Sequence, residues 1–586
     1  MLRKPNAHQL GVLVVGVALG GLASPAAALP LTDVPAQADV SYLPSGGHGR
    51  IDLDFGASGV GDVNGDGFDD VALDAFFANR AGGGAVVALG GPRRMTIRVE
   101  SDAGRVFEVR GAAVSGPAGD VNGDGVDDLL ARDPEADQGR GAAYVIFGQR
   151  SADPTDVDVE NLAARGVRIT GAPGDRVGSS VTGAGDVNRD GLDDVAVTAI
   201  TERGRGYAAI VFGSRTSAAV ELSVLGGRGY RIDGLCAGYF RNSNAGTEDF
   251  DEGSLTASLA RAGDLNRDGM QDLLIGLGRE ADELCPGRGG RVLVVYGKRD
   301  TQAISATRLG GRGIVMYGPE GTGTSVAGAG DVNGDRRPDV IVPTGRGAAV
   351  VFDLRAVRTV RLLRAPRRTL LVGGSGDSVD DTPVSSLGDV NGDGLADFGM
   401  GVHVLRGQRS KRDRTLRPLR GGGYAVRLTT SGAAGFAAGA VARAGDVNGD
   451  GRADVLVPPT SLGPSGTYVL WGLGPPLAEV GPFRSRVFAD RRGRIRLRVL
   501  CPGNTAGLCR GRVHLSRRGA TVLRRSFRAA AGSMTTVAGR LPYGLRRVLR
   551  RGGTAEVRAV AVARDARGLR GVSRRTLSLL AKASPP

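Results

Sequence analysis

The sequence predicts an all-β protein built from a repeated unit, and three observations support this. A motif of the form G-D-x-N-x-D recurs seven times between residues 61 and 457. Its first aspartates are 58, 66, 78, 67, 58 and 57 residues apart, steps longer than those of helical solenoid repeats. A short apolar run rich in β-branched residues follows each motif, and 97 glycines among 586 residues suit strands joined by many turns.

Each copy keeps an oxygen-bearing side chain at positions 1, 3, 5 and 9, and six of the seven have Gly at position 6. Calcium takes six to eight oxygen ligands from carboxylates, amides and backbone carbonyls, so the pattern predicts one calcium site per copy. The predicted ligand sets, in which the fourth residue contributes its carbonyl, are Asp62, Asn64, Asp66, Phe68 and Asp70; Asp120, Asn122, Asp124, Val126 and Asp128; Asp186, Asn188, Asp190, Leu192 and Asp194; Asp264, Asn266, Asp268, Met270 and Asp272; Asp331, Asn333, Asp335, Arg337 and Asp339; Asp389, Asn391, Asp393, Leu395 and Asp397; and Asp446, Asn448, Asp450, Arg452 and Asp454.

Other loops share part of this pattern. Asn, Asp and Gly also form plain hairpin turns, but a turn does not need oxygen at four fixed positions. EF-hand loops close with Glu at position 12 between helices, and dockerin-type repeats also need a carboxylate there. Position 12 here is apolar in every copy, and the flanking segments read as strands. The aspartate at position 9 is therefore predicted to close the loop.

The repeats resemble the FG-GAP repeats of integrin alpha subunits. Besides the loops, the resemblance rests on strand ends such as Phe147-Gly148 and Phe212-Gly213 and on segments such as GYRIDG at 229–234. It covers residues 40–475 and implies a seven-bladed β-propeller with calcium in its hairpin loops. All seven units carry the motif, as in bacterial members of the family, so up to seven calcium ions are expected.

In this interpretation one blade has an inner strand that ends in the calcium loop, then strands such as DVAVTA, YAAIVFG and the outer GYRIDG. The first segment of outer-strand type, GRIDLD at 49–54, precedes the first loop. An unpaired strand would leave an exposed edge, so this segment is expected to complete the seventh blade and close the ring.

Residues 1–28 are predicted to be a secretory signal peptide. Arg3 and Lys4 precede an apolar run from about residue 10 to 23, and Ala26 and Ala28 form a small-residue cleavage site. The run is too short to span a bilayer, and no later segment is apolar for long enough. The protein is therefore expected to be secreted or at the cell surface, without a transmembrane anchor.

Four cysteines suit an oxidising compartment. Cys501 and Cys509 flank a short loop and are expected to form a local disulfide. In the propeller interpretation, Cys236 and Cys285 lie in two connections that emerge on the face opposite the calcium loops. A second disulfide between them is therefore predicted.

The charge is divided unevenly along the chain. From residue 481 onward, 26 Arg and Lys face 3 acidic residues, a net charge of +23, which leaves −8 for residues 1–480. Residues 484–582 alternate apolar and polar positions, as in RIRLRVL, which predicts a basic Ig-like β-sandwich. Its arginines suit an anionic cell-wall polymer or another polyanion. A solvated strand face in an Arg-biased chain is the other interpretation; no nucleic-acid partner is expected.

The sequence favours a binding or adhesion module for an extracellular protein or glycan. No GxSxG, HExxH or Walker motif is visible, the histidines stand in unrelated contexts, and most clustered aspartates are assigned as ligands. The protein is therefore not expected to be an enzyme. A calcium-dependent polysaccharide lyase or glycosidase and a purely structural surface protein remain alternatives.

The ligand site is predicted in the insertion at 234–254, which contains Tyr239, Phe240 and Arg241 and accounts for the longest step between repeats. The other interpretation is a loop stapled only for protease resistance. We expect replacement of all three residues by Ala to abolish ligand binding and to leave the melting temperature of the calcium-bound protein unchanged, as measured by binding titration and thermal melts. Retained binding in the folded variant would place the site elsewhere on the ring or on the C-terminal domain.

Overall fold

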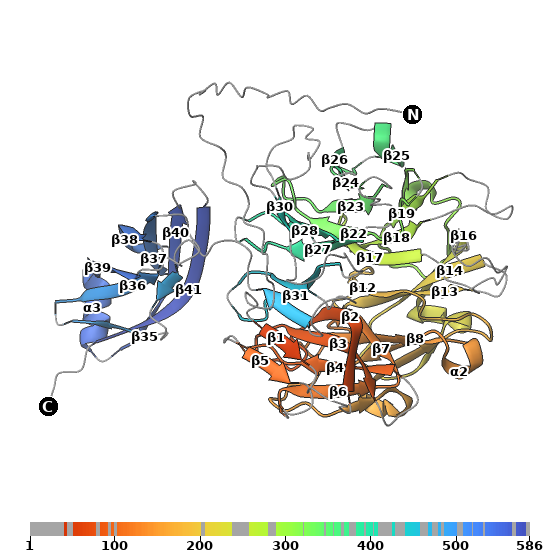
Figure 1. Cartoon of the computed structure of the whole chain (residues 1–586), viewed down its shortest axis with the longest axis horizontal. Helices are drawn as coiled ribbons and strands as arrows, with labels where there is room; N and C mark the ends of the chain where they lie inside the picture. The colour runs from red at the N-terminus through yellow and green to blue at the C-terminus, as the bar shows by residue number, and fades with distance from the viewer. Residues whose placement is uncertain are drawn as a thin grey trace, which may run out of the picture.

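The structure, a computed structural model, describes residues 40–581 except for 44–50, 237–256, 279–288, 374–382, 408–424, 428–439, 458–466, 471–478, 501–507 and shorter gaps. The described strands form nine sheets, seven from residues 40–470 and two from residues 479–581 (Figure 1). The predicted signal peptide at 1–28 lies outside the described residues.

The third sheet shows the strand order that the seven sheets share. Strands β12 (Val181–Gly185), β13 (Asp194–Ile200), β14 (Arg205–Val211) and β16 (Gly229–Cys236) lie side by side in sequence order, and all are antiparallel. This is the predicted order of inner, second, third and outer strand. Most positions of β13 and β14 are buried because the sheet is covered on both faces, which explains their continuous apolar runs.

The other six sheets, each from the inner to the outer strand, are β2 (Ile51–Gly61), β3 (Asp70–Phe77), β4 (Gly83–Ala88) and β6 (Val106–Arg110); β7 (Ala113–Gly119), β8 (Asp128–Asp133), β9 (Ala142–Ile146) and β11 (Gly166–Thr170); β17 (Ala257–Gly263), β18 (Asp272–Leu277), β19 (Arg291–Val295) and β21 (Gly313–Tyr317); β22 (Ala327–Gly330), β23 (Asp339–Pro343), β24 (Gly347–Val351) and β26 (Thr369–Gly373); β27 (Val384–Gly388), β28 (Asp397–Met400), β29 (His403–Leu405) and β30 (Ala425–Arg427); and β31 (Ala442–Gly445), β32 (Asp454–Val457), β33 (Thr467–Leu470) and β1 (Val40–Leu43).

Five of these sheets gain a short parallel strand from the next unit of the chain. In the third sheet, β20 (Ile304–Ser305) pairs with the outer strand β16. The corresponding strands elsewhere are β5 (Met95–Arg98), β10 (Val157–Asp158), β15 (Val220–Glu221) and β25 (Thr359–Arg361). Each such strand ties one unit to its neighbour at the outer edge, which the sequence did not predict.

The inner strands form a closed circuit. Each contacts the inner strand of the next sheet, and β31 of the last sheet contacts β2 of the first (Figure 1). A separate hydrophobic cluster fills each interface between consecutive sheets, including one in which Val71 and Val86 of the first sheet pack with Leu456 and Val469 of the last. The core is therefore divided among the sheet interfaces.

The N-terminal segment closes this circuit, but through a different strand from the predicted one. Strand β1 (Val40–Leu43) pairs antiparallel with β33, Val40 opposite Val469 and Tyr42 opposite Thr467, and is the outer strand of the last sheet. The predicted segment, 49–54, instead contributes Ile51–Asp54 to the long inner strand β2, which pairs with β3. The assignment of GRIDLD was wrong because its alternating pattern also suits the start of an inner strand.

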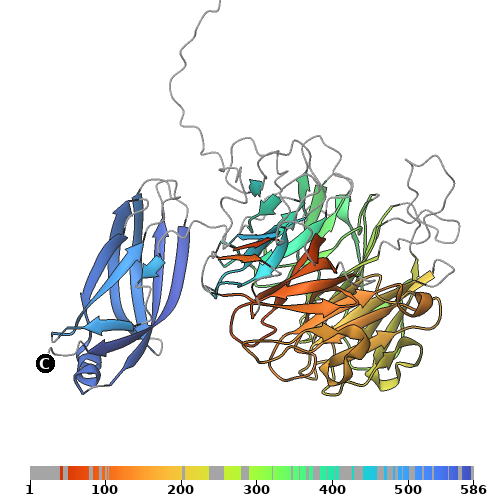
Figure 2. The ribbon, with the colours of Figure 1, turned by 60° about the horizontal axis from the view of Figure 1, so that its bottom comes forward.

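The C-terminal sheets enclose a core of their own. One contains β34 (Glu479–Gly481), β36 (Arg494–Leu500) and β39 (Met534–Arg540). The other runs in the order β35 (Arg486–Ala489), β41 (Arg570–Ala581), β40 (Ala555–Arg564), β37 (Leu508–Arg517) and β38 (Ala520–Ala530). Residues from both sheets and from helix α3 (Tyr543–Arg550) form one hydrophobic cluster, which is consistent with two packed layers (Figure 2).

Cys509 is fully buried in this cluster and takes part in a disulfide. Its predicted partner Cys501 lies outside the described residues. Cys285 also lies outside them, and Cys236 is described only as the end of strand β16. No helix in the described part of the chain is both long and apolar enough to cross a lipid bilayer.

The glycine after each aromatic strand end packs tightly between two units. A methyl group on Gly148 would lie 2.3 Å from the carbonyl oxygen of Asp127 and 2.8 Å from that of Val63, which belongs to the preceding unit. Gly213 and Gly297, and Gly90 after Leu89, likewise lie close to one carbonyl oxygen of their own unit and one of the preceding unit. A side chain at these four positions would clash with backbone atoms, which cannot move aside as a flexible side chain can.

We expect Gly148→Ala to lower the free energy of unfolding by about 1–3 kcal/mol, the usual cost of overpacking. Gly227→Ala is the matched control, because a methyl group on Gly227 would have no neighbouring atom within 4 Å, and its effect should stay within about 0.5 kcal/mol. Denaturant unfolding of both variants measures the difference. Equal effects in the two variants would contradict the tight packing.

Candidate metal-binding loops

Each predicted loop lies between an inner strand and the second strand of its sheet. The inner strand ends at a glycine with positive φ, such as Gly185 at 72°. The second strand begins at the ninth loop position, where the aspartate is fully buried. These aspartates are Asp70, Asp128, Asp194, Asp272, Asp339, Asp397 and Asp454.

Backbone N–H groups orient the side-chain oxygens of the loop. In the third loop, the Asp186 carboxylate accepts hydrogen bonds from the N–H groups of Asp190 and Gly191, both at 3.0 Å. Asn188 Oδ1 accepts from Asp190 N–H at 2.8 Å, and Asp190 Oδ1 accepts from Leu192 N–H at 2.9 Å. The first, second and fourth loops repeat this arrangement. An oxygen that accepts one such bond keeps a lone pair for a cation.

The closing aspartate connects three parts of the sheet. Asp194 Oδ2 accepts from Val187 N–H within the loop, and Oδ1 accepts from Gly213 N–H, each at 2.8 Å. Gly213 is the glycine after the aromatic end of the third strand. Asp70, Asp128 and Asp272 make the same pair of bonds, and Asp397 does so through Gly407. Both motifs are visible in the sequence, but the hydrogen bond between them was not predicted.

Burial raises the pKa of the closing carboxyl groups. The pKa values of Asp128, Asp194 and Asp272 are raised to about 7, and that of Asp339 to about 8. Removal from water disfavours the charged form, and the other two aspartates of each loop add to the effect. Two backbone N–H bonds only partly offset it. A cation at the loop would favour the ionised form.

The donor set fits a hard cation. Side chains at positions 1, 3, 5 and 9 offer carboxylate and amide oxygens, the ligands that calcium prefers. Within the described residues, no three His, Cys, Asp or Glu side chains converge as a metal cluster. In the last three loops Asn333, Asn391 and Asn448 donate Nδ2 to the closing aspartate. Coordination there requires the amide to present Oδ1 instead.

The fifth loop contains an unsatisfied ligand oxygen. Asp335 Oδ1 is buried and has no hydrogen-bond partner. A buried polar atom without a partner costs about 1–3 kcal/mol. A bound cation would give this oxygen a partner, which supports a metal at the loop.

Neighbouring loops are hydrogen-bonded to each other around the circuit. The N–H at position 8 of one loop donates to the carbonyl at position 1 of the preceding loop, as Asp193 does to Asp120 at 3.1 Å. The last and first loops are joined in the same way, from Asp69 to Asp446. Where position 8 is Asp, its side chain also accepts the N–H of position 1, as Asp127 does from Asp62. This role of position 8 was not predicted from the sequence.

Position 4 also adopts a left-handed backbone conformation. It is Gly in the first, second, fifth and seventh loops, with positive φ in each, but Arg189 and Arg267 occupy it in the third and fourth, at φ 60° and 66°. Arg336, at position 6 of the fifth loop, also has positive φ, at 64°. Three loops therefore carry an arginine in the left-handed conformation.

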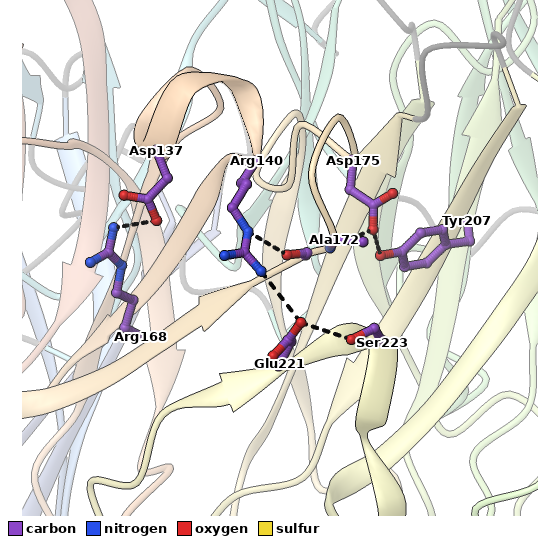
Figure 3. A network of polar contacts seen from close by, with 9 residues as sticks. Asp137, Arg140, Arg168, Ala172, Asp175, Tyr207, Glu221 and Ser223 are labelled. Atoms are coloured by element: carbon purple, nitrogen blue, oxygen red, sulfur yellow. Dashed lines mark hydrogen bonds and ion pairs between the residues drawn. The ribbon is translucent and has the colours of Figure 1, made fainter.

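Polar contacts also join the second and third sheets at the opposite end of their strands (Figure 3). Arg140, next to helix α2 (Ala136–Gly139), bonds to the Gly171 carbonyl at 3.1 Å and to Glu221 at 3.4 Å. Tyr207 donates to the buried Asp175 at 2.6 Å. Each of these polar groups has a partner within the network.

Several predicted site residues fall outside the described part of the chain. They are Asp393 and Asp450 of the sixth and seventh loops, and Tyr239, Phe240 and Arg241 of the insertion.

The chain is similar in sequence to integrin alpha subunits, although no protein-family model matches it. It is 28% identical over 262 residues to integrin alpha pat-2 of Caenorhabditis briggsae and 29% identical over 250 residues to integrin alpha-8 of Gallus gallus. These matches cover 43% and 42% of this chain but only 19% and 21% of the relatives' own lengths. The chain therefore contains an integrin alpha-like FG-GAP region, as the motifs predicted.

Among solved structures, the extracellular domain of the putative one component system BT4673 from B. thetaiotaomicron matches with a TM-score of 0.32 and 8% identity. The match covers 94% of this chain and 59% of that one.

We expect the fifth loop to bind calcium most weakly. Arg336 carries positive φ, which costs about 1–2 kcal/mol, and Pro338 has no N–H to donate to the fourth loop. Arg336→Gly should therefore tighten the weakest calcium site about tenfold, as measured by calorimetric titration; Arg189→Gly is the control that changes a different site. A wild-type structure with full occupancy and normal ligand distances at the fifth loop would contradict this.

Proposed function

We propose that the chain is a secreted or cell-surface, calcium-stabilised seven-bladed β-propeller that serves as a binding or adhesion module for an extracellular protein or glycan. The observation that carries the proposal is the seven-fold repetition of one ligand set. Every described closing aspartate is buried, and five of the seven bond to the glycine of the third-strand end.

The closed circuit of inner strands supports the blade count. Seven sheets share one strand order, a hydrophobic cluster fills each interface, and the last sheet meets the first. A closed ring leaves only the short outer edges of its sheets unpaired. A rigid ring of this kind is suited to presenting loops to a partner.

Calcium would be held by the side chains at positions 1, 3, 5 and 9 and by the carbonyl at position 7. Its contribution is to neutralise carboxylates that repel each other within one loop. The protein contributes the geometry: backbone N–H groups orient the oxygens, and burial of the closing aspartate fixes one ligand to the sheet. The loops thus serve a structural role in the ring.

The ligand is proposed to bind at the face of the ring opposite the calcium loops. Connections between second and third strands, and between the outer strand and the next inner strand, emerge at the end of the sheets away from the calcium loops. The long insertion at 234–254 and the predicted Cys236–Cys285 disulfide belong to these connections. The relatives' name, integrin, also favours adhesion over catalysis.

A glycan array combined with a depolymerisation assay tests this role against the enzyme alternative. The full-length protein with calcium should bind a glycan or an extracellular-matrix protein and release no shorter products. Release of unsaturated or reducing-end sugars would instead identify a polysaccharide lyase or glycosidase.

Calcium removal should destabilise the ring. A site saturated at 100 times its dissociation constant contributes about 2.7 kcal/mol, so excess chelator should lower the melting temperature substantially, as followed by differential scanning fluorimetry. An unchanged melt in chelator would contradict the calcium assignment.

Two neighbouring aspartates provide a matched control. Asp190→Ala removes a predicted ligand oxygen and should reduce the stoichiometry of calcium in a calorimetric titration by one ion. Asp193→Ala removes the side chain that accepts the Asp120 N–H but no predicted ligand, and should leave the stoichiometry unchanged.

A further inference from the structure

Arginines lie in register across the five-stranded C-terminal sheet. Arg510 on β37 lies opposite Arg528 on β38 and opposite Arg564 on β40. Arg564 in turn lies opposite Arg570 on β41. One row across four adjacent strands therefore consists of arginines alone.

Further arginines share this face of the sheet. Arg512 is two residues along β37 from Arg510, and Arg524 lies opposite His514 in the next row. Arg558 lies opposite Ser516. We call the six with exposed side chains the arginine face: Arg510, Arg512, Arg524, Arg528, Arg558 and Arg564.

Alternation along the strands points this face away from the core. On β37 the intervening residues Cys509, Val513 and Leu515 are fully buried, and on β40 Ala559, Ala561 and Ala563 are buried. Val560 and Val562 lie half-buried among the arginines and give the face an apolar floor.

The fold does not offset the charge on this face. Like charges directly opposite each other destabilise a sheet. None of the six arginines forms an ion pair with another described residue. Glu556, at the far end of β40, is the one acidic residue of the described sheet on this side. Exposed arginines in register therefore reduce stability without a compensating partner in the protein.

We propose that the arginine face binds a flexible, linear polyanion whose charges are phosphate groups. Neighbouring strands are about 4.8 Å apart, and alternate residues on one strand are about 6.8 Å apart, so the face presents guanidinium groups on a grid of that spacing. Guanidinium binds phosphate oxygens through two parallel hydrogen bonds, which a lysine ammonium does not do. The segment from residue 481 onward has 25 Arg and a single Lys.

The open, sheet-like form of the face favours a flexible chain over a rigid duplex. A flexible chain can follow rows of charge in two directions and lay its uncharged atoms over Val560 and Val562. This surface is separate from the ring, so the inference goes beyond the binding role proposed above and does not depend on it.

The test uses the full-length calcium-loaded protein and fluorescently labelled long-chain inorganic polyphosphate. The face variant combines Arg510→Gln, Arg528→Gln and Arg564→Gln. The control variant combines Arg494→Gln, Arg496→Gln and Arg547→Gln, which removes three exposed arginines from the other sheet and from α3. Both variants lose the same charge.

The face variant should lose about tenfold or more in affinity for polyphosphate. Its plot of log affinity against log salt should be shallower by about 2, since each phosphate contact of a single-stranded chain contributes roughly 0.7. The control variant should lose less than about threefold. The melting temperature of the face variant should equal or exceed that of the wild type, because like charges have been separated.

Three results would overturn the proposal. Equal losses in the two variants would show that net charge binds the polymer and that the face has no special role. Polyglutamate binding as tightly as polyphosphate would exclude phosphate recognition. Duplex DNA binding more tightly than polyphosphate would identify a rigid nucleic acid as the partner.

Discussion

The buried aspartate at the ninth loop position is the constraint on which the rest of the ring depends. In the third unit, Asp194 begins the second strand, accepts a hydrogen bond from Val187 in its own loop, and accepts another from Gly213 at the end of the third strand. A carboxylate placed there is costly unless it is bonded and its charge is compensated. The loop provides the bonds, and a cation would provide the compensation.

Because Gly213 also packs against the carbonyl of Val121 in the preceding unit, this one aspartate helps to place two units. Bonds between position 8 and position 1 add a second connection between loops, so the loops form a hydrogen-bonded belt around most of the circuit. The belt is interrupted at Pro338, which has no N–H. The same unit has Asp353 with positive φ where others have the packed glycine, so the fifth unit departs from the pattern at several linked positions.

The loops and the strand order of a unit could be predicted because both depend on local sequence: oxygen donors at fixed spacing, and apolar runs between turns. The strand that completes the last sheet could not be assigned correctly from the sequence. Residues 49–54 and Val40–Leu43 both have strand-like patterns, and only the tertiary pairing with β33 distinguishes them. The left-handed conformation of Arg189 and Arg267 was not predicted, because arginine rarely adopts it. Packing of the loop imposes a conformation that the local sequence disfavours.

The arginine face shows a further limit of sequence patterns. Alternation along β37 tells which residues point outward, and by itself it suits a solvated surface as well as a binding surface. Register supplies the missing information, because it places Arg528, Arg510 and Arg564 in one row although they belong to three strands. A face that is only solvated gains no stability from such a row, because arginines placed further apart or alternating with acidic residues would repel each other less. A polymer with regularly spaced phosphates gains from it, because one chain can contact several guanidinium groups at once.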